Sequence, residues 1–503
     1  MVRLVSLFCV LLAATPLVGP ATIARSADTA SSLAEQLDAV LSDARLDGVV
    51  VGVTVRSATT GEIVYRRDGD LRMSPGSNQK LMTSAAALAE LGPGYRFHTS
   101  VLVRDRPHAG IVAGDLYLRG GGDPTIVPDR LDELAAALVA AGVKQVGGGL
   151  VADDTFFDDV RLGTDWSWQD ETFPYAAPIS ALSLAPDTDA DAGSVEVDIL
   201  PGTSPGTPAQ VALTPPTRTM RVDNQVVTGP PGSARHLTGV REHGSNRILV
   251  NGTIPLGGRP AQPLLSVDDP TGYTADVFAS ALARHGVRLA TDVPRHGSTP
   301  SSAVELADLD SRPLGEVLVP LLKRSSNPMA EMLVKTMGAR DAGTGSWDAG
   351  LAVVRRFVAT HDLDPARLQL VDGSGLSTSD LVAPDDLTAL LVAVQREPWF
   401  ATWYAALPIA GQPEPLVGGT LADRMRDTPA AGNVHAKTGT LATASALSGY
   451  VATAAGEAFV FSIIESGFVG APLTDVEDRV AVTLASLPDC VVICGSARAG
   501  DGR

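Results

Sequence analysis

The alternation of apolar and polar positions at the start of the chain predicts a helix, a hairpin and a second helix. Apolar residues recur at helical spacing over residues 32–45, which indicates a helix. Two β-rich runs, residues 49–56 and 63–67, flank a Thr-Thr-Gly turn and predict a β-hairpin. Residues 77–91 again follow helical spacing, and the pair Gly92-Pro93 ends that helix.

The pattern changes between about residues 98 and 284. Short strand candidates alternate there with turns rich in glycine and proline. The clearest candidates are residues 114–119, 195–200 and 247–254. We therefore expect this middle segment to form one or two strand-rich domains.

Helical patterns return after residue 285, and two strand candidates follow them. The helices are expected over residues 328–337, 347–361 and 384–396, and the strands over residues 445–453 and 458–465. We therefore expect residues 28–97 and 285–490 to form one discontinuous α/β (α+β) domain, a sheet flanked by helices. The middle segment, residues 98–284, is then an insertion, and residues 491–503 are a C-terminal tail.

The N-terminus has the pattern of a secretory signal. Arg3 precedes a mostly apolar run over residues 4–18, and the small residues Ala24 and Ser26 fit a cleavage site. An uncleaved membrane anchor is the alternative, but the run is shorter than the about 20 residues that a span needs. We expect a signal peptide over residues 1–27, no integral membrane span after its removal, and export to the cell wall or the periplasmic space.

Composition narrows the possible classes of protein. The 503 residues exceed what one hydrophobic core usually supports, so two or three domains are expected. Hydrophobic residues make up 45% and charged residues 19%, which is typical of a globular chain. The net charge of −18 argues against nucleic acid or an anionic membrane as a partner. Cys490 and Cys494, which remain after signal removal, could form a disulfide in an exported protein or stay as two free thiols.

Candidate chemistry first appears where the second helix begins, with Ser77-Asn78-Gln79-Lys80. Positions i and i+3 share one face of a helix, so the Lys80 amine can approach the Ser77 hydroxyl. A neutral lysine, its pKa lowered by burial or by nearby positive charge, can take the proton of that hydroxyl. The alternative is a serine N-cap followed by a solvated lysine, and this common pattern alone does not exclude it.

Two further motifs follow in a fixed order. The first is Ser325-Ser326-Asn327, directly before a predicted helix, and the second is Lys437-Thr438-Gly439-Thr440, which leads into a β-rich run. Each alone is consistent with a helix cap or with a turn before an exposed strand. The three motifs in this order and these local contexts are typical of penicillin-binding proteins and class A β-lactamases.

With these motifs the sequence resembles the low-molecular-weight class C penicillin-binding proteins, the D-alanyl-D-alanine carboxypeptidase/endopeptidase family (peptidase family S13). Ser77 and Ser325 are 248 residues apart (325 − 77 = 248), whereas single-domain serine β-lactamases keep these motifs much closer. The resemblance implies a β-lactamase/transpeptidase-like domain, an antiparallel sheet flanked by helices, with a large strand-rich insertion. Further matching stretches are residues 114–118, 120–124, 153–157, 166–168 with Tyr175, 177–184 and 372–377.

The resemblance also implies catalytic roles. Ser77 would attack the carbonyl of a terminal D-alanyl-D-alanine bond in peptidoglycan stem peptides, and Lys80 would be its base. Ser325 would relay the proton to the departing amine, and Lys437 would favour a neutral Lys80. The backbone N–H groups of Ser77 and Thr440 would form the oxyanion hole. β-Lactam antibiotics mimic the dipeptide, so they would acylate the same serine.

Residues that bind the substrate follow from the same resemblance. Asn327 would orient Lys80 and the substrate amide, and Thr438 and Thr440 would bond to the substrate's terminal carboxylate. Gly439 would let the substrate backbone approach the strand closely.

Asp153 is a further candidate for substrate binding, because an acidic side chain in this part of the insertion could pair with the free amine of a diaminopimelate-type residue. An ordinary turn aspartate is the alternative. No clustered metal ligands, phosphate loop or dinucleotide motif appears in the sequence, so no metal and no cofactor is implied. Two rival functions share the fold: a serine β-lactamase, which the long insertion disfavours, and a catalytically silent cell-wall binding protein, which does not require the intact motifs.

Overall fold

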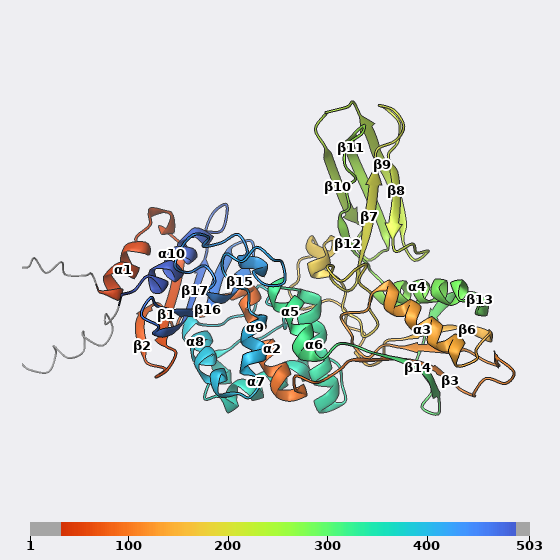
Figure 1. Ribbon diagram of the computed structural model, residues 1–503, viewed down its shortest axis with the longest axis horizontal. Helices are drawn as coiled ribbons and strands as arrows, with labels where there is room; N and C mark the ends of the chain where they lie inside the picture. Colours follow the sequence, from red (N-terminus) through yellow and green to blue (C-terminus); the bar gives the residue numbers. More distant parts are fainter. Residues whose placement is uncertain (1–31, 489–503) are drawn as a thin grey trace, which may run out of the picture.

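The computed structural model describes residues 32–488. The predicted signal peptide over residues 1–27, the residues Cys490 and Cys494, and the predicted tail lie outside the described residues. The molecule is elongated, with a domain built from both ends of the chain at one side and the inserted part at the other (Figure 1). Within residues 32–488, no helix has the length and the apolar character that crossing a membrane requires.

One antiparallel sheet joins the two ends of the chain. Its strands are β1 (Val50–Ser57), β2 (Ile63–Arg67), β15 (His435–Thr440), β16 (Ala444–Ala452) and β17 (Ala458–Ser466). They are ordered β15-β16-β17-β1-β2, and every neighbouring pair is antiparallel. The sheet pairs Val53 with Ile463, so the predicted hairpin of β1 and β2 lies beside the predicted C-terminal strands.

Helices cover both faces of this sheet. Helices α1 (Leu33–Val40) and α10 (Thr474–Ala485) share a buried cluster with Val53 and Val55 of β1. The opposite face, with Ile464 of β17, packs against the cluster that contains α8 (Pro384–Ala393) and the helix that carries Lys80. Since successive side chains of a strand point to opposite faces, both faces of the sheet are buried. This sandwich of sheet and helices is the mixed α/β fold that the sequence predicts.

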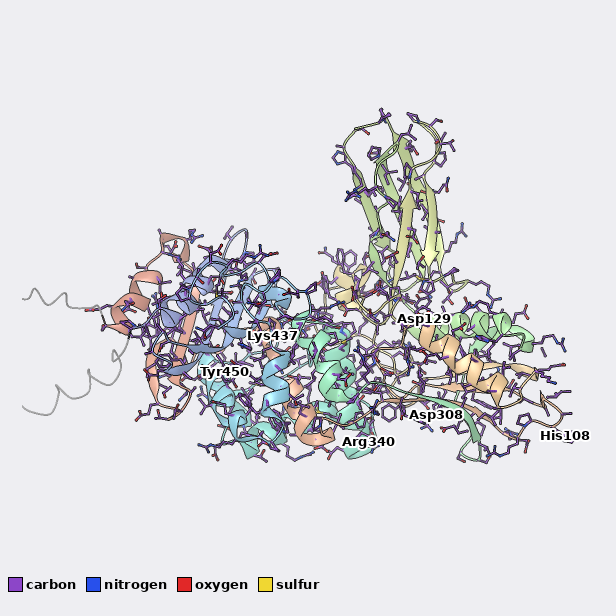
Figure 2. All side chains as sticks on the ribbon, in the orientation of Figure 1. His108, Asp129, Asp308, Arg340, Lys437 and Tyr450 are labelled. Atoms are coloured by element: carbon purple, nitrogen blue, oxygen red, sulfur yellow. The ribbon has the colours of Figure 1, made fainter. Side chains whose placement is uncertain are left out.

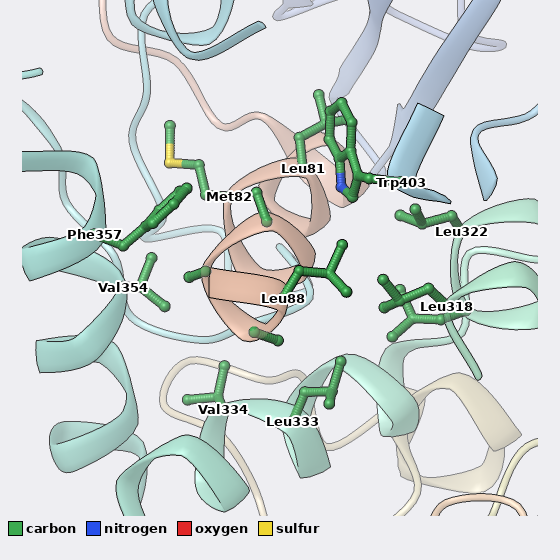
Figure 3. Packing of buried hydrophobic residues seen from close by; sticks show 14 of the residues in the cluster. Leu81, Met82, Leu88, Leu318, Leu322, Leu333, Val334, Val354, Phe357 and Trp403 are labelled. Carbon is green, nitrogen blue, oxygen red and sulfur yellow. The ribbon is translucent and has the colours of Figure 1, made fainter. Parts of the chain in front are cut away.

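The helix that follows Ser77 is the centre of the helical half. This helix, α2 (Gln79–Leu91), is surrounded by α5 (Leu314–Lys323), α6 (Asn327–Ala342), α7 (Trp347–Thr360) and α9 (Phe400–Ala406). Figure 3 shows Leu81, Met82 and Leu88 directed outward from α2 toward side chains of these four helices. Leu81 and Leu88 are almost completely buried, and each such side chain contributes about 1.5–3 kcal/mol to folding. The packing fixes α2 and therefore the position of Lys80.

The inserted part begins with a second sheet. Its strands are β3 (His98–Val103), β4 (Ile111–Val112), β5 (Leu116–Arg119), β6 (Gln145–Asp153), β13 (Arg288–His296) and β14 (Val304–Asp310). The order is β13-β6-β5-β3-β14, and β4 also pairs with β6. Helices α3 (Pro128–Ala140) and α4 (Pro270–Arg284) bury their apolar faces in the core of this domain.

The end of the insertion differs from the expected boundary at residue 284. Strand β13 pairs with β6, and β14 pairs with β3, so this sheet continues to Asp310. The sequence patterns did not indicate this, because β13 is mostly exposed and lacks the apolar alternation of a half-buried strand. The helical half resumes with α5.

A smaller unit projects from the inserted part, as Figure 1 shows. It contains two three-stranded sheets, ordered β12-β7-β8 and β10-β11-β9. Their strands are β7 (Ser194–Leu200), β8 (Gln210–Thr214), β9 (Arg221–Gly229), β10 (His236–Arg241), β11 (Arg247–Pro255) and β12 (Leu264–Ser266). The prediction of a strand-rich insertion is therefore confirmed, and the loop that follows β6 and precedes β7 runs back toward the helical half.

Candidate active site

Ser77 lies in a short 3₁₀ turn, Gly76–Asn78, that leads directly into α2. Lys80 is in the first turn of that helix, and its Nζ lies 2.8 Å from the Ser77 Oγ. The i, i+3 spacing thus brings the amine to the hydroxyl, as the sequence predicts.

The Lys80 amine is completely buried and has three polar neighbours. Besides Ser77 Oγ, its Nζ contacts Asn327 Oδ1 at 2.6 Å and the carbonyl oxygen of Ser374 at 2.9 Å. Asn327 Nδ2 donates to the carbonyl oxygen of Tyr175 at 2.9 Å, which requires Asn327 Oδ1 to face Lys80. Asn327 Oδ1 and the carbonyl oxygen of Ser374 can only accept hydrogen bonds. A neutral Lys80 amine therefore has an acceptor for each of its two N–H groups, and its lone pair is left for the Ser77 hydroxyl.

Burial lowers the pKa of Lys80 to about 8, because the charged amine is removed from water. The carboxylates of Glu331, Asp372, Asp191 and Asp380 oppose this shift. A pKa near 8 leaves a substantial fraction of the amine neutral near pH 7 to 8, which suits a general base.

Ser325 and Lys437 form a second pair beside the first. Lys437 is on β15, and its Nζ donates to Ser325 Oγ and to the carbonyl oxygen of Thr438, both at 2.8 Å. Burial, and secondly the charge of Lys80, lowers the pKa of Lys437 well below its usual range. Ser325 has a φ of +62°, a conformation that non-glycine residues rarely adopt and that is concentrated at functional sites.

Ser77, Ser325 and Asn327 open onto one cavity of about 540 Å³. Its walls come from the 3₁₀ turn, from the loop before α6, from β15 and the turn after it, and from the loop between β6 and β7. The lining residues are Ser77, Asp170, Tyr175, Ser325, Asn327, Gly375, Leu376, Thr420, Thr438, Thr440, Leu441 and Ala442. The volume is within the usual range of ligand pockets, about 300–1,000 Å³.

Two glycines allow β15 to pack directly against the turn that carries Ser77. A Cβ added to Gly439 would lie 2.3 Å from the carbonyl oxygen of Pro75 and 3.1 Å from the backbone nitrogen of Ser77. A Cβ added to Gly76 would lie 3.0 Å from the backbone nitrogen of Thr440. The Ser77 and Thr440 backbones therefore meet at the same wall of the cavity, as an oxyanion hole requires.

A buried network under the site holds the loop that supplies the Ser374 carbonyl. The Glu331 carboxylate accepts from the backbone nitrogens of Gly373 and Ser374, both at 2.8 Å, and from Trp347 Nε1 at 2.7 Å. Asp372 Oδ1 accepts from the backbone nitrogens of Ser374 at 3.0 Å and Gly375 at 2.6 Å. The loop, and with it one of the acceptors for Lys80, is thereby fixed.

The structure brings together eight of the nine predicted site residues. Ser77, Lys80, Ser325, Asn327, Lys437, Thr438, Gly439 and Thr440 all lie at or against the cavity. Figure 2 shows Lys437 beside α5 and α6, where the helical half meets the sheet.

Asp153 is the exception. It is buried at the end of β6, where its carboxylate accepts from the backbone nitrogen of Thr155 at 3.0 Å and from that of Thr299 at 2.7 Å. Although burial opposes ionisation, the hydrogen bonds from Thr155 and Thr299 hold the pKa of Asp153 below its usual value. The carboxylate caps a turn and is not among the residues that line the cavity, so its expected substrate contact stays a prediction, whereas Asp170 is an acidic residue in the cavity wall.

Among the residues that the structure describes, one group has ligand atoms close enough to share a metal ion. His98, Asp308 and Asp310 have such atoms within 4.8 Å of one another. All three are exposed, and Figure 2 places Asp308 in the inserted part, away from Lys437. His98 Nδ1 contacts Asp310 at 2.8 Å and its Nε2 contacts Glu305 at 3.2 Å, so both ring nitrogens already have carboxylate partners.

The comparison with known proteins decides the family. Residues 33–487 match the model of the D-Ala-D-Ala carboxypeptidase 3 (S13) family. The chain belongs to this family. The S13 chain is 44% identical over 478 residues to a D-alanyl-D-alanine carboxypeptidase of Actinomadura sp. (strain R39), with 94% of this chain and 88% of that protein covered. It is 27% identical over 431 residues to the D-alanyl-D-alanine carboxypeptidase DacB of Haemophilus influenzae, with 84% and 86% covered.

The fold of this S13 peptidase also matches a solved structure. The crystal structure of penicillin binding protein 4 (dacB) from Haemophilus influenzae superposes with a TM-score of 0.77 at 24% identity, covering 90% of this chain and 99% of that chain. A second structure of that protein, complexed with a novel β-lactam, superposes with a TM-score of 0.70. The predicted family and fold are therefore confirmed.

Sequence reasoning missed several groups in the site of this S13 peptidase. Asp170 and Tyr175 come from the loop between β6 and β7, and Thr420 from a short 3₁₀ turn before β15. Tyr175 had a signal, since it is itself one of the residues that match the family, although no role in the site was predicted for it. The carbonyl of Ser374 gave no signal in the sequence beyond its glycine-rich loop, because any residue type can make a contact through its backbone.

Proposed function

We propose that this peptidase hydrolyses the terminal D-alanyl-D-alanine bond of peptidoglycan stem peptides through an acyl-enzyme on Ser77. The contact of Lys80 Nζ with Ser77 Oγ at 2.8 Å carries the proposal. It joins a nucleophile to a buried amine whose pKa is lowered by burial, and the two other neighbours of that amine accept its N–H groups.

In the first step, Ser77 Oγ attacks the carbonyl carbon of the penultimate D-alanine as its proton passes to Lys80. The negative charge that develops on the carbonyl oxygen is stabilised by the backbone N–H groups of Ser77 and Thr440. Each such donor contributes about 3–4 kcal/mol to the stability of the transition state.

In the second step, the amide C–N bond breaks and the departing nitrogen gains a proton. Ser325 Oγ, which accepts a hydrogen bond from Lys437, is placed to deliver that proton. The carboxylate of the leaving residue lies against Lys437, Thr438 and Thr440, whose amine and hydroxyl groups can donate hydrogen bonds to it. Water then attacks the ester, Lys80 takes the proton of the water, and Ser77 is regenerated.

Asp170 supports a substrate that carries a positive charge. Its side chain lines the cavity, and its Oδ1 accepts from the Tyr175 hydroxyl at 2.9 Å. We propose that this carboxylate pairs with the free side-chain amine of the stem peptide, the role that the sequence suggested for Asp153. Such stem peptides are extracytoplasmic, which agrees with the export that the N-terminal pattern predicts.

A β-lactam undergoes the same attack by Ser77. Its acyl part and its leaving nitrogen belong to one molecule, so they stay linked after the attack. The departed nitrogen remains in the site and hinders water, so the adduct persists. A serine β-lactamase would instead release the product rapidly.

The test is the release of D-alanine. We expect the purified protein to release D-alanine from a pentapeptide ending in D-Ala-D-Ala and not from its L-Ala-L-Ala counterpart, and we expect Ser77→Ala to abolish release. Rapid turnover of benzylpenicillin with no release of D-alanine would favour the β-lactamase.

A further inference from the structure

A smaller cavity, of about 340 Å³, lies where the helical half meets the inserted part. Arg340, near the end of α6, lines it from the helical half, and Tyr95 lines it from the link between α2 and β3. Arg119 at the end of β5 and Phe156 just after β6 line it from the inserted part. Figure 2 shows Arg340 at the end of α6. The cavity shares no lining residue with the catalytic cavity, so it is a separate feature of the molecule.

The inserted sheet turns one of its two faces toward this cavity. Helices α3 and α4 cover the other face, where Val101 and Leu118 are buried. Ser100 on β3 is directly opposite Arg119 on β5, so their side chains share the face that α3 and α4 leave free. Both residues line the cavity.

Three arginines line the cavity, namely Arg96, Arg119 and Arg340. Arg96 Nη1 donates to the carbonyl oxygen of Ser311 at 2.5 Å, and the Arg340 guanidinium lies 6.0 Å from the centroid of the Tyr95 ring. Within residues 32–488, none of the three arginines forms an ion pair with a carboxylate. All three side chains are exposed, so their remaining N–H groups are accessible to a ligand.

This concentration of positive charge contrasts with the rest of the chain, whose net charge is −18. Asp341, the neighbour of Arg340 in the sequence, is paired at 2.9 Å with Arg356, which also contacts Glu90 at 3.4 Å. Arg340 therefore keeps its full charge. Like charges gathered around one small cavity repel one another, and an anion that enters the cavity relieves this repulsion.

Negative charge lies beside the cavity at His98, which also lines it. The two ring nitrogens of His98 contact Asp310 and Glu305, and the Ser100 hydroxyl donates to Glu305 at 2.7 Å. His98 and Ser100 thus already have carboxylate partners. The three guanidiniums are the donors that remain for a ligand.

The chemistry of these donors selects the ligand. A guanidinium presents parallel N–H groups that match the oxygens of a phosphate or a carboxylate. A carboxylate brings one negative charge to the three arginines, whereas a phosphate monoester brings about 1.5–2. Tyr95 and Phe156 add ring surface against which an organic group attached to the phosphate can pack.

We propose that this cavity binds a phosphate group, carried either by a small soluble ester or by the headgroup of a lipid. The two sources share one chemistry, which is a phosphate held by the guanidiniums of Arg96, Arg119 and Arg340. The volume is within the usual range of small-molecule sites, about 300–1,000 Å³. The inference is independent of the reaction proposed for Ser77.

The test is isothermal titration calorimetry of the purified protein with glycerol 3-phosphate and with glycerate, in which a carboxylate replaces the phosphate. We expect a Kd of about 1 mM or lower for glycerol 3-phosphate and binding of glycerate that is weaker by about tenfold or more. Arg119→Gln and Arg340→Gln should each weaken the binding of glycerol 3-phosphate by about tenfold, because each removes a charge-assisted contact. Arg259→Gln is the matched control and should leave the affinity unchanged, since this exposed arginine of the smaller unit does not line the cavity.

Vesicles distinguish the two sources of the phosphate. Co-sedimentation with phosphatidylglycerol vesicles that is lost in Arg340→Gln would assign the site to a lipid headgroup. Binding of glycerol 3-phosphate without co-sedimentation would assign it to a soluble ester, which we expect because the acidic chain is repelled by an anionic membrane.

The inference would be overturned by the absence of binding to both probes, by glycerate binding as tightly as glycerol 3-phosphate, or by an unchanged affinity in both glutamine variants. Release of D-alanine should be the same in these variants as in the unmodified protein, because neither arginine lines the catalytic cavity. This activity shows that the variants are folded, and it separates a failure of the phosphate site from a failure of the proposed function.

Discussion

Gly439 lies against Ser77 so closely that no side chain fits between them. A Cβ at Gly439 would approach the Ser77 backbone nitrogen to 3.1 Å and the Pro75 carbonyl oxygen to 2.3 Å, and neither atom belongs to a flexible side chain. The requirement for glycine in this strand is therefore steric. It lets β15 and the turn before α2 build one wall of the cavity.

Gly439→Ala should separate these two backbones and misplace the oxyanion donors. Because a displacement of 1 Å can cost about 100-fold in rate, we expect the rate of Ser77 acylation by benzylpenicillin to fall by about that factor. Stopped-flow or quenched mass spectrometry measures this rate. Gly94→Ala is the control, since a Cβ at Gly94 meets no atom within 4 Å; equal rates in the two variants would contradict the steric account.

The pH dependence of kcat/KM should follow Lys80, because only its neutral amine can accept the serine proton. Burial lowers the pKa of Lys80 to about 8, so kcat/KM should rise with pH and level off above about 8. A pH profile of D-alanine release measures this limb. A profile that is flat between pH 6 and 9 would show that the Lys80 amine is not the titrating base.

Glu331→Gln should move the rise of kcat/KM to lower pH. The ionised Glu331 carboxylate stabilises the Lys80 ammonium and so raises its pKa, and its own pKa is raised to about 7 chiefly by burial. Removing the negative charge lowers the pKa of Lys80, and the amine becomes neutral at lower pH. The exposed Asp348→Asn is the matched control and should leave the pH profile unchanged. A shift of the profile to higher pH in Glu331→Gln would contradict this role of the Glu331 charge.

Asp170→Asn should weaken the recognition of a free side-chain amine. With a pentapeptide that carries such an amine, we expect kcat/KM to fall by about tenfold, whereas the same peptide with the amine acetylated should lose less than about threefold. Asp153→Asn is the comparison. This variant should not discriminate between the two peptides, because the Asp153 carboxylate already accepts hydrogen bonds from the backbone nitrogens of Thr155 and Thr299. The opposite pattern would restore Asp153 as the substrate contact.

Arg241 ties the smaller inserted unit to the loop that carries Asp170. Its guanidinium is fully buried and donates to the carbonyl oxygen of Glu171 at 2.9 Å and to Asp268 at 2.9 Å. Arg241→Met removes these donors, and we expect a loss of about 3 kcal/mol in stability and a higher KM for the amine-bearing peptide. Thermal unfolding and steady-state kinetics measure the two effects. An unchanged KM would show that the smaller unit does not position Asp170.

The sequence predicts the catalytic centre better than the rest of the cavity, for a physical reason. Ser77 and Lys80 are related by the local geometry of one helix, and Ser325 and Lys437 are in short motifs whose order is diagnostic. Asp170, Tyr175 and Thr420 reach the cavity through loops, whose paths depend on how the inserted part packs. The position of Asp153 outside the cavity wall depends on the same packing.

The fold, like the site, was predictable where the local sequence pattern was clear and not where it depended on weakly patterned long-range pairing. The pairing of β1 with β17 could be expected, because both strands have apolar runs and the motifs require the chain ends to meet. Strands β13 and β14 could not be assigned to the insertion, since their pairing with β6 and β3 spans well over 100 residues and their exposed faces carry little apolar pattern.

The most direct test is the intact mass of the protein after incubation with benzylpenicillin, followed by peptide mapping. We predict a mass increase equal to one penicillin molecule, located on Ser77, that persists for minutes or longer and is absent in Ser77→Ala and strongly slowed in Lys80→Ala. An unchanged mass in a folded protein, or an adduct on another residue, would contradict the assignment of Ser77 as the nucleophile.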